Sequence, residues 1–299
     1  ERIASLFTPT IPCTLENKLY CSTSYLRASM KVLTLNSDPV FEFPFLNAGQ
    51  GPKTSSVDRL PVQIATVDQF PDGLAAIIVT SDLQGREHYQ YQVSGALRLL
   101  GEWLPSVLKN SVLPLLNIRK GRIGVLLAGD FYTVPGLDKR GGSGDVTSVW
   151  EAFAQCFSWV VGVAGNHDTF GVDSLKPPCF EPPVYFLDLE SISLEELTIA
   201  GISGIVGNPN KPWRKTEDEF LRFIHGLGSA QPDILLMHDG PDIPNSGCPG
   251  SSKIRETLSG LNNTLVIRGH KYWNNPLMEI HYGLQILNVN ARVVILLPS

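Results

Sequence analysis

The chain has 299 residues, of which 43% are apolar, and a formal net charge of −5. This length and composition allow one large buried core in a layered domain. The acidic balance disfavours a protein that holds long nucleic acid through a basic surface, although a bound metal ion would add positive charge that the count omits.

The cysteines and the hydropathy pattern bear on the compartment. Five cysteines are scattered along the chain without a C-x-x-C pair, which argues against a disulfide framework or a thiolate zinc site and favours a reducing compartment. No run of about 18 apolar residues is present, and no charged-then-apolar leader follows Glu1, although a trimmed leader would leave no trace. We therefore predict a cytoplasmic protein that does not enter a membrane, with its oligomeric state open.

Residues 1–74 differ in pattern from the rest of the chain. Ser29–Phe45 and Val62–Asp68 are strand-like, and the segment between them, Asn47–Ser56, is rich in glycine, serine and polar residues. We expect residues 1–74 to form an N-terminal extension that adds strands to a sheet edge or caps the site. Residues 75–299 then form the main domain.

After residue 74, short apolar runs alternate with helical patterns, which indicates βαβ units and a buried sheet. The expected helices are Tyr89–Leu108, Val146–Phe157, Glu217–Leu227 and Ser252–Leu258. The expected strands are Ala75–Thr80, Ile123–Leu127, Val160–Ala164, Leu197–Ile202, Ile234–Met237, Leu265–Ile267, Leu277–His281, Leu284–Asn288 and Val293–Leu297. The last three of these strands, separated only by turns, predict an antiparallel meander.

Polar residues follow five of these strands at their carboxyl ends, the edge at which ligands bind in open α/β sheets. They are Asp82 and Gln84, Asp130, Asn166-His167-Asp168, His238, and His270. Carboxylate, amide and imidazole donors suit divalent ions such as Mn²⁺, Fe²⁺ or Zn²⁺. Asp130 is the natural bridging carboxylate, and two ions about 3.5–4 Å apart would clamp a phosphate and activate a water molecule.

The order of these motifs resembles that of the calcineurin-like metallophosphoesterases. The family signature runs DxH, GD, GNHD, H, GHxH. This chain reads Asp82-x-Gln84, Gly129-Asp130, Gly165-Asn166-His167-Asp168, His238 and Gly269-His270-x-Tyr272. The resemblance implies an α/β fold, a four-layer α/β/β/α sandwich of two mixed sheets.

The resemblance also implies roles for individual residues. Asp130, Asn166, His238 and His270 match the ligands of one metal ion. The set for the other ion matches only at Asp82 and Asp130, because Gln84 and Tyr272 stand where the family has histidines. Glutamine is a weaker ligand than imidazole, and tyrosine is a poor one unless it is deprotonated. We therefore expect one tight ion and a second that is weak or absent.

The remaining catalytic roles are also implied by the resemblance. His167 matches the residue that contacts the phosphate and protonates the leaving oxygen, with Asp168 beside it to orient and charge the ring. A cationic side chain can replace the charge of a missing ion. Arg86, Lys139 and Arg140 are the candidates, and Arg140 is preferred because it opens the glycine-rich loop Gly141–Asp145.

The predicted function is metal-dependent hydrolysis of a phosphomonoester or phosphodiester, with a phosphorylated small molecule as the expected substrate. Two alternatives stay open. Loss of the two histidines is also compatible with a non-catalytic scaffold of this fold, or with a sensor that binds a nucleotide or phosphate and turns it over slowly. The sequence does not distinguish a nucleotide, a phosphoprotein, a nucleic-acid end or a lipid head group.

Overall fold

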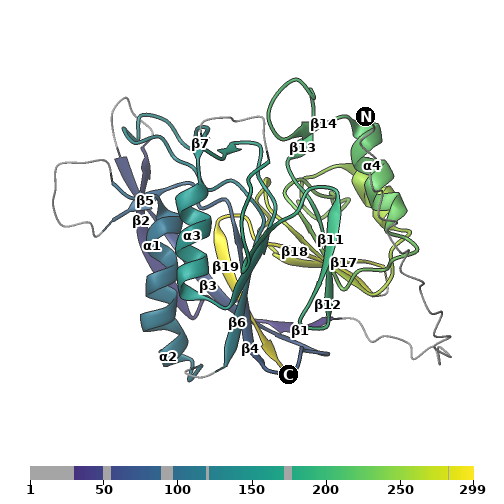
Figure 1. The fold of residues 1–299 in the computed structure, drawn as a ribbon, viewed down its shortest axis with the longest axis horizontal. Coiled ribbons are helices and arrows are strands. Elements are labelled where there is room, and N and C mark those ends of the chain that lie inside the picture. The colour runs from purple at the N-terminus through teal and green to yellow at the C-terminus, as the bar shows by residue number, and fades with distance from the viewer. Residues whose placement is uncertain (1–29, 50–54, 89–96, 119–120, 172–176, 282) are drawn as a thin grey trace, which may run out of the picture.

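The computed structural model describes residues 30–49, 55–88, 97–118, 121–171, 177–281 and 283–299. Most of its strands belong to two mixed sheets (Figure 1). Nine strands of the described chain form the larger sheet, in the order β10-β8-β6-β4-β19-β3-β2-β5, with β1 also paired to β3. Their bounds are β1 Val32–Leu35, β2 Phe41–Ala48, β3 Ser55–Val67, β4 Leu74–Ser81, β5 Arg86–Glu87, β6 Arg122–Leu127, β8 Trp159–Gly162, β10 Val184–Phe186 and β19 Arg292–Pro298.

The second sheet has the order β11-β12-β15-β16-β18-β17 among the described residues. Its strands are β11 Glu190–Leu194, β12 Leu197–Ile202, β15 Ile234–Met237, β16 Thr264–Arg268, β17 Leu277–His281 and β18 Leu284–Asn288. Two short pairs stand apart, β7 Gly144–Asp145 with β9 Asp168–Thr169, and β13 Ile205–Val206 with β14 Arg214–Lys215.

The helices cover the outer faces of the two sheets. They are α1 Leu100–Val107, the π-helical turn η1 Leu108–Val112, α2 Leu113–Leu115, α3 Thr147–Cys156, α4 Glu217–Gly226 and α5 Ser252–Leu258. Figure 1 shows α1 and α3 on one side of the molecule and α4 on the opposite side. The predicted α/β class with two mixed sheets is confirmed.

The central strands of both sheets are buried on both faces, because their side chains point alternately to the two faces and each face is covered by apolar side chains. Along β6, Val125 packs in the core under α1 and α3, whereas Leu126 packs in the core between the sheets. Along β15, Leu236 joins the core between the sheets, and Leu235 joins the core under α4 and α5. This explains why the strands read as continuous apolar runs rather than as alternating ones.

The predicted meander at the end of the chain is wrong. The strands β17 and β18 pair antiparallel, but β19 leaves them and pairs with β3 and β4 in the larger sheet. The apolar run Val293–Leu297 is compatible with either neighbour, so the pattern alone does not determine the pairing. The expected helix Tyr89–Leu108 lies partly outside the described residues, and its described part begins at Leu100.

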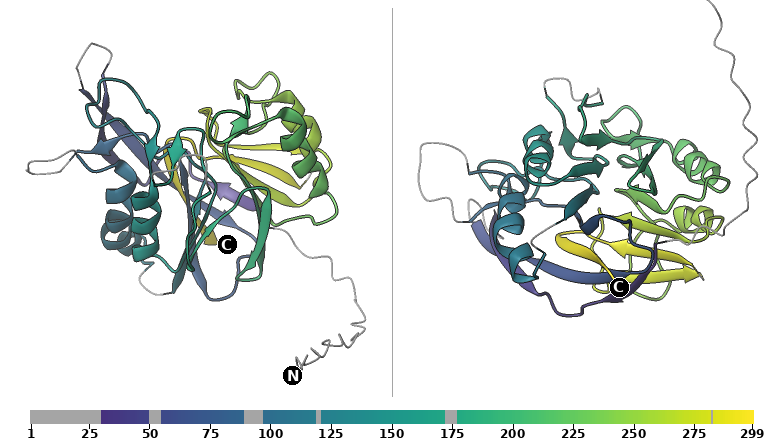
Figure 2. Two further views of the ribbon diagram at one scale, coloured as in Figure 1. Left: turned by 45° about the horizontal axis from the view of Figure 1, so that its top comes forward. Right: turned by 60° about the horizontal axis from the view of Figure 1, so that its bottom comes forward.

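Strands from the two ends of the chain lie side by side, blue and yellow in Figure 2. The parallel pairing of β3 with β19 and the antiparallel pairing of β19 with β4 connect residues 55–67 to the first strand of the main domain. The described strands before residue 74 are therefore part of the larger sheet. The domain division at residue 74 stays a prediction.

Replacement of Leu60 on β3 tests whether this early strand stabilises the whole fold. Leu60 is 1% exposed and packs in the core with α1 and α3. We expect Leu60→Ala to lower the free energy of unfolding by about 2–5 kcal/mol, measured by denaturant titration. Leu33→Ala on β1, where the residue is 51% exposed, is the control and should change stability by less than about 0.5 kcal/mol. Equal stability of both variants would contradict the integral role of β3.

Candidate active site

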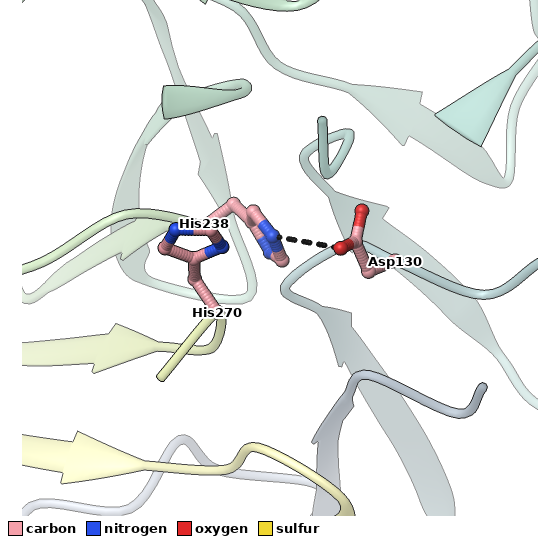
Figure 3. Close-up of side chains that lie close together, drawn as sticks. All are labelled: Asp130, His238 and His270. Carbon is pink, nitrogen blue, oxygen red and sulfur yellow. Dashed lines mark ion pairs between the residues drawn. The ribbon is translucent and has the colours of Figure 1, made fainter. Parts of the chain in front are cut away.

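The residues predicted as metal ligands follow strands of both sheets and meet where the sheets face each other. Asp130 follows β6 of the larger sheet, whereas His238 and His270 follow β15 and β16 of the smaller one. One ligand atom from each of these three residues lies within 4.8 Å of the others (Figure 3). The structure thus brings three of the predicted ligands together from two sheets and from distant parts of the sequence.

The ring of His238 is oriented for ligation. Its Nδ1 lies 2.7 Å from the carbonyl oxygen of Ala128, so the N–H on Nδ1 donates to the backbone. The other nitrogen, Nε2, faces the carboxylate of Asp130 at 3.2 Å, without a well-aligned hydrogen bond. Such fixing of one nitrogen, with the other free to bind, is typical of metal-ligating histidines.

Two buried polar atoms, one in this cluster and one on the adjoining loop of the GNHD motif, lack a well-aligned hydrogen bond among the described residues. They are the Oδ1 atom of Asn166 and the Nε2 atom of His238, both almost inaccessible to solvent. A buried polar atom without a partner costs about 1–3 kcal/mol, so such atoms are rare without a ligand. Together with Asp130 and His270 they form a set of amide, imidazole and carboxylate donors that fits one divalent ion.

The charges of the cluster also favour a bound cation. Burial raises the pKa of Asp82 to about 6, and the charge of Asp130 adds to the effect. Burial alone would lower the pKa of His238, but the negative charges of Asp130 and Asp82 outweigh it and raise this pKa to about 10. For His270, burial and the neighbouring His238 lower the pKa to about 4. The carboxylates therefore stabilise a positive charge at this point, which a metal ion supplies as well as a proton does.

The buried carboxylate of Asp168 holds neighbouring loops together. It accepts hydrogen bonds from the backbone N–H groups of Asp130, Phe131 and Gly165, each at 2.8 Å. Burial, with the charge of Asp130, raises the pKa of Asp168 to about 7 even though these donors oppose the shift. Both oxygens hold the loops that carry Asp130 and Asn166. The role of Asp168 in orienting the ring of His167 stays a prediction.

The hydroxyl group of Ser143 lies beside the ring of His167. Its Oγ lies 3.2 Å from Nδ1 of the His167 ring, and the backbone N–H of Gly144 donates to the His167 carbonyl. The backbone N–H of His167 donates in turn to Oδ1 of Asp130 at 2.9 Å. The sequence indicates an anion contact for the glycine-rich loop, but the pairing of this loop with His167 depends on the β7–β9 contact, which has no local signal.

The residues of the second predicted metal position are engaged in other contacts. The Gln84 amide donates to Oδ2 of Asp130 at 3.3 Å and packs against Gly141, where an added Cβ would lie 3.2 Å from it. Oδ2 of Asp82 accepts from Ser81 and from the backbone N–H of His270. The guanidinium carbon of Arg292 lies over the Tyr272 ring, 4.8 Å from the centroid of the ring.

Among the predicted cations, the structure places Arg140 at the site. Arg140 lines a cavity of about 600 Å³ together with Asp82, Gln84 and His270. Its guanidinium is held by Asp58 of β3 at 3.2 Å, a partner that the sequence analysis missed because it lies far away along the chain. Arg86 is buried and donates to the carbonyls of Leu97 and Thr133, so it is not available to a substrate. Lys139 is exposed and is not among the residues that line this cavity.

Two glycines are required by close approaches at the site. A Cβ on Gly165 would lie 2.0 Å from Oδ1 of Asp130, and one on Gly269 would lie 2.4 Å from Oδ2 of Asp82. No side chain fits at these distances, so both GNHD and GH motifs need their glycine for steric reasons. The motifs therefore encode the close packing of the loops as well as the ligands.

The fold and the site define an α/β domain with metal-binding side chains at its strand ends. The family model for calcineurin-like phosphoesterases matches residues 75–273, and the chain belongs to this family. The family implies metal-dependent phosphoester hydrolysis.

Among solved structures, the chain is similar to the crystal structure of TT1561 of Thermus thermophilus. The TM-score is 0.48 at 13% sequence identity, with coverage of 72% of this chain and 88% of that one. No curated protein matches the sequence. No helix of the described residues is long and apolar enough to cross a membrane.

Removal of the Asp168 carboxylate tests its structural role. Asp168→Ala leaves the buried N–H groups of three residues without an acceptor, so we expect a loss of about 3–5 kcal/mol in the free energy of unfolding, measured by denaturant titration. Asp218→Ala on α4, where the carboxylate is 79% exposed, is the control and should be nearly neutral. An Asp168→Ala protein of unchanged stability would show that these hydrogen bonds are dispensable.

Proposed function

We propose that this protein hydrolyses phosphoesters with one tightly bound divalent ion, held by Asp130, Asn166, His238 and His270. The observation that carries the proposal is the set of carboxylate and imidazole groups of Asp130, His238 and His270 within the described part of the chain, with two buried ligand atoms, Nε2 of His238 and Oδ1 of Asn166, that lack a well-aligned hydrogen bond. Mn²⁺, Fe²⁺ and Zn²⁺ suit these donors. When bound, the ion would neutralise phosphate oxygens and make a water molecule more acidic.

The contacts at the second position support a single tight ion. Gln84 uses its amide N–H to satisfy Asp130, and the Tyr272 ring is stacked on the guanidinium of Arg292. Only Asp82 then remains as a strong additional ligand, and one of its oxygens already accepts two hydrogen bonds. A second ion would therefore bind weakly or not at all, with Gln84 and Asp82 as its remaining ligands.

His167 serves as the acid in this proposal. As a water oxygen bonds to phosphorus, the bond from phosphorus to the leaving oxygen breaks, the leaving oxygen takes a proton from His167, and the water gives its proton to solvent. Ser143 holds Nδ1 of the ring, which leaves Nε2 to transfer the proton. The backbone contact from His167 to Asp130 fixes this acid relative to the ligand cluster.

Arg140 supplies positive charge beside the weak second position. Its side chain is 63% exposed, and one nitrogen of the guanidinium contacts Asp58, so other N–H groups remain for phosphate oxygens. A fixed cation near the transferred group stabilises the charge that develops on the phosphate oxygens. Asp58 thus acts as a positioning residue for Arg140.

A cytoplasmic location and a small phosphorylated substrate belong to the same proposal. The described cysteines, Cys156, Cys179 and Cys248, are free thiols, which supports a reducing compartment. The net charge of −5 disfavours long nucleic acid as a substrate.

Metal content and turnover in two variants test the proposal. The purified protein should bind about one ion per chain by elemental analysis and hydrolyse bis-p-nitrophenyl phosphate or p-nitrophenyl phosphate with added Mn²⁺. We expect Asn166→Ala to weaken metal binding by roughly tenfold or more, because an inward-facing ligand is lost. His167→Ala should keep the metal and lose about 10²- to 10⁴-fold in kcat, because only the acid is removed.

Matched controls and contrary outcomes complete this experiment. Asn274→Ala and His225→Ala replace exposed residues of the same types and should leave metal content and turnover unchanged. Two tight ions per chain would contradict the account of Gln84 and Tyr272. Metal binding without turnover would favour a phosphate or nucleotide sensor, and absence of both would favour a scaffold.

The role of Arg140 has its own test. We expect Arg140→Ala to lower kcat/KM by about 10- to 100-fold with metal content unchanged, because a cation at the phosphate is lost. Arg140→Lys should recover part of the activity, since it restores the charge but not the forked geometry. Arg222→Ala on α4, an arginine of similar exposure, is the control. Equal kcat/KM for Arg140→Ala and the unmodified protein would exclude Arg140 from the site.

A further inference from the structure

The cavity beside the ligand cluster has walls that the family domain does not supply. It has a volume of about 600 Å³, within the range of roughly 300–1,000 Å³ common for small-molecule sites. At one end lie Asp82, Gln84 and His270 of the candidate metal centre. Most of the other lining residues come from β2, β3 and the turn before β19, outside the matched range 75–273. Residues outside the matched family range therefore shape the space next to the candidate metal centre.

The charges in the cavity argue against a second anionic group. Arg59 lies 3.6 Å from Glu42, and Arg140 lies 3.2 Å from Asp58, so each arginine of the lining has a carboxylate partner. With Asp82 added, the charged side chains of the lining, two arginines and three acids, sum to −1 when His270 is neutral. A polyphosphate tail or an acidic peptide would meet carboxylates here. An uncharged group with hydrogen-bonding edges fits better.

Tyr272 forms a flat, supported surface in this cavity. The residue is 54% exposed, which is unusual for a large aromatic residue beside the fully buried Trp273. One face of the ring is covered by the guanidinium of Arg292, which is itself buried and donates to the Trp273 carbonyl at 2.7 Å. The rigid support keeps the ring in place, and the cavity gives a planar ligand access to it. Aromatic rings of this kind bind nucleobases by stacking.

Polar groups for the edge of a planar ligand lie on the same cavity. The side-chain amide of Asn290 has no hydrogen-bond partner within the described part of the chain and offers both a donor and an acceptor. The carboxylate of Asp58 can accept from an exocyclic amino group while it holds Arg140. Because Tyr272 is two residues from His270, their Cα atoms lie within about 7 Å of each other, and both residues line the same cavity. A ribose bridges a separation of this order between a base and its phosphate.

We propose that this cavity binds the nucleoside part of a nucleoside monophosphate ester, with the base stacked on Tyr272 and the phosphate directed to the end formed by Asp82 and His270. This rests on the proposed function and names the class of its substrate. The strands β2 and β3 then serve substrate recognition as well as the stability of the sheet.

Binding of nucleosides without phosphate separates this proposal from catalysis. Adenosine, guanosine and cytidine are titrated into the full chain by isothermal titration calorimetry, with D-ribose as the ligand that lacks a base. We expect at least one nucleoside to bind and D-ribose not to bind. Tyr272→Leu should weaken that binding by roughly 5- to 100-fold, whereas Tyr272→Phe should stay within about twofold, because stacking needs the ring and not the hydroxyl.

The controls keep each outcome decisive. Leu115→Ala removes an exposed apolar side chain of α2, at a residue 68% exposed and not part of the cavity lining, and should leave nucleoside binding unchanged. Absence of binding for all three nucleosides, or equal affinity of the Tyr272→Leu and unmodified proteins, would overturn the proposal. Metal-dependent turnover of p-nitrophenyl compounds without nucleoside binding would refute this inference alone. Nucleoside binding without any turnover would refute the proposed hydrolysis and leave the binding site standing.

Discussion

The contact between Asp130 and His238 is the interaction on which the site depends, because it joins the two sheets at their active edge. The carboxylate follows β6 and the imidazole follows β15, yet Oδ2 and Nε2 lie 3.2 Å apart in a buried environment. Bringing the two groups out of water costs several kcal/mol unless each finds partners. Asp130 accepts hydrogen bonds from the backbone N–H of His167 and from the Gln84 amide, and His238 donates one to the carbonyl of Ala128. Nε2 of His238 and Oδ1 of Asn166 are left without a well-aligned hydrogen bond among the residues that the structure describes, and both atoms are of the kinds that ligate a metal ion.

Backbone strain is concentrated at the same place. Asp82, Asp130 and His270 have φ between +53° and +65°, the left-handed region that side chains with a Cβ seldom adopt. Each such residue costs of the order of 1–3 kcal/mol, so the surrounding contacts must hold it. Asp168 does so for Asp130 through three backbone N–H groups, and Asp82 does so for His270. The ligand geometry is thus set by hydrogen bonds to the backbone before any ion binds.

Local patterns predicted the sheet strands and the motif positions well, because buried parallel strands are continuous apolar runs that end in polar residues. The ends of β12, β15, β17 and β18 agree with the expected ranges residue for residue. Contacts between distant segments were not predictable from these patterns. They include the pairing of β19 with β3, the hydrogen bond of Ser143 with His167, and the ion pair of Asp58 with Arg140. Asp168 shows the same limit, since its motif position gave no sign that its partners are backbone N–H groups.

Gln84 and Tyr272, at the two positions where the family signature leads us to expect histidines, each make a contact that belongs to this site. Gln84 donates a hydrogen bond to Asp130 at the place where a second ion would supply positive charge. The Gln84 amide packs against Gly141, where an added Cβ would lie 3.2 Å from it. Tyr272 is anchored on Arg292, which belongs to β19, the strand that ties residues 55–67 to the main sheet. A histidine at position 84 or 272 would therefore face surroundings that fit the present residues, namely the packing of Gln84 on Gly141 and the contact of Tyr272 with Arg292. The position predicted for a second ion thus lies between the candidate metal centre and a cavity built mainly by other parts of the chain.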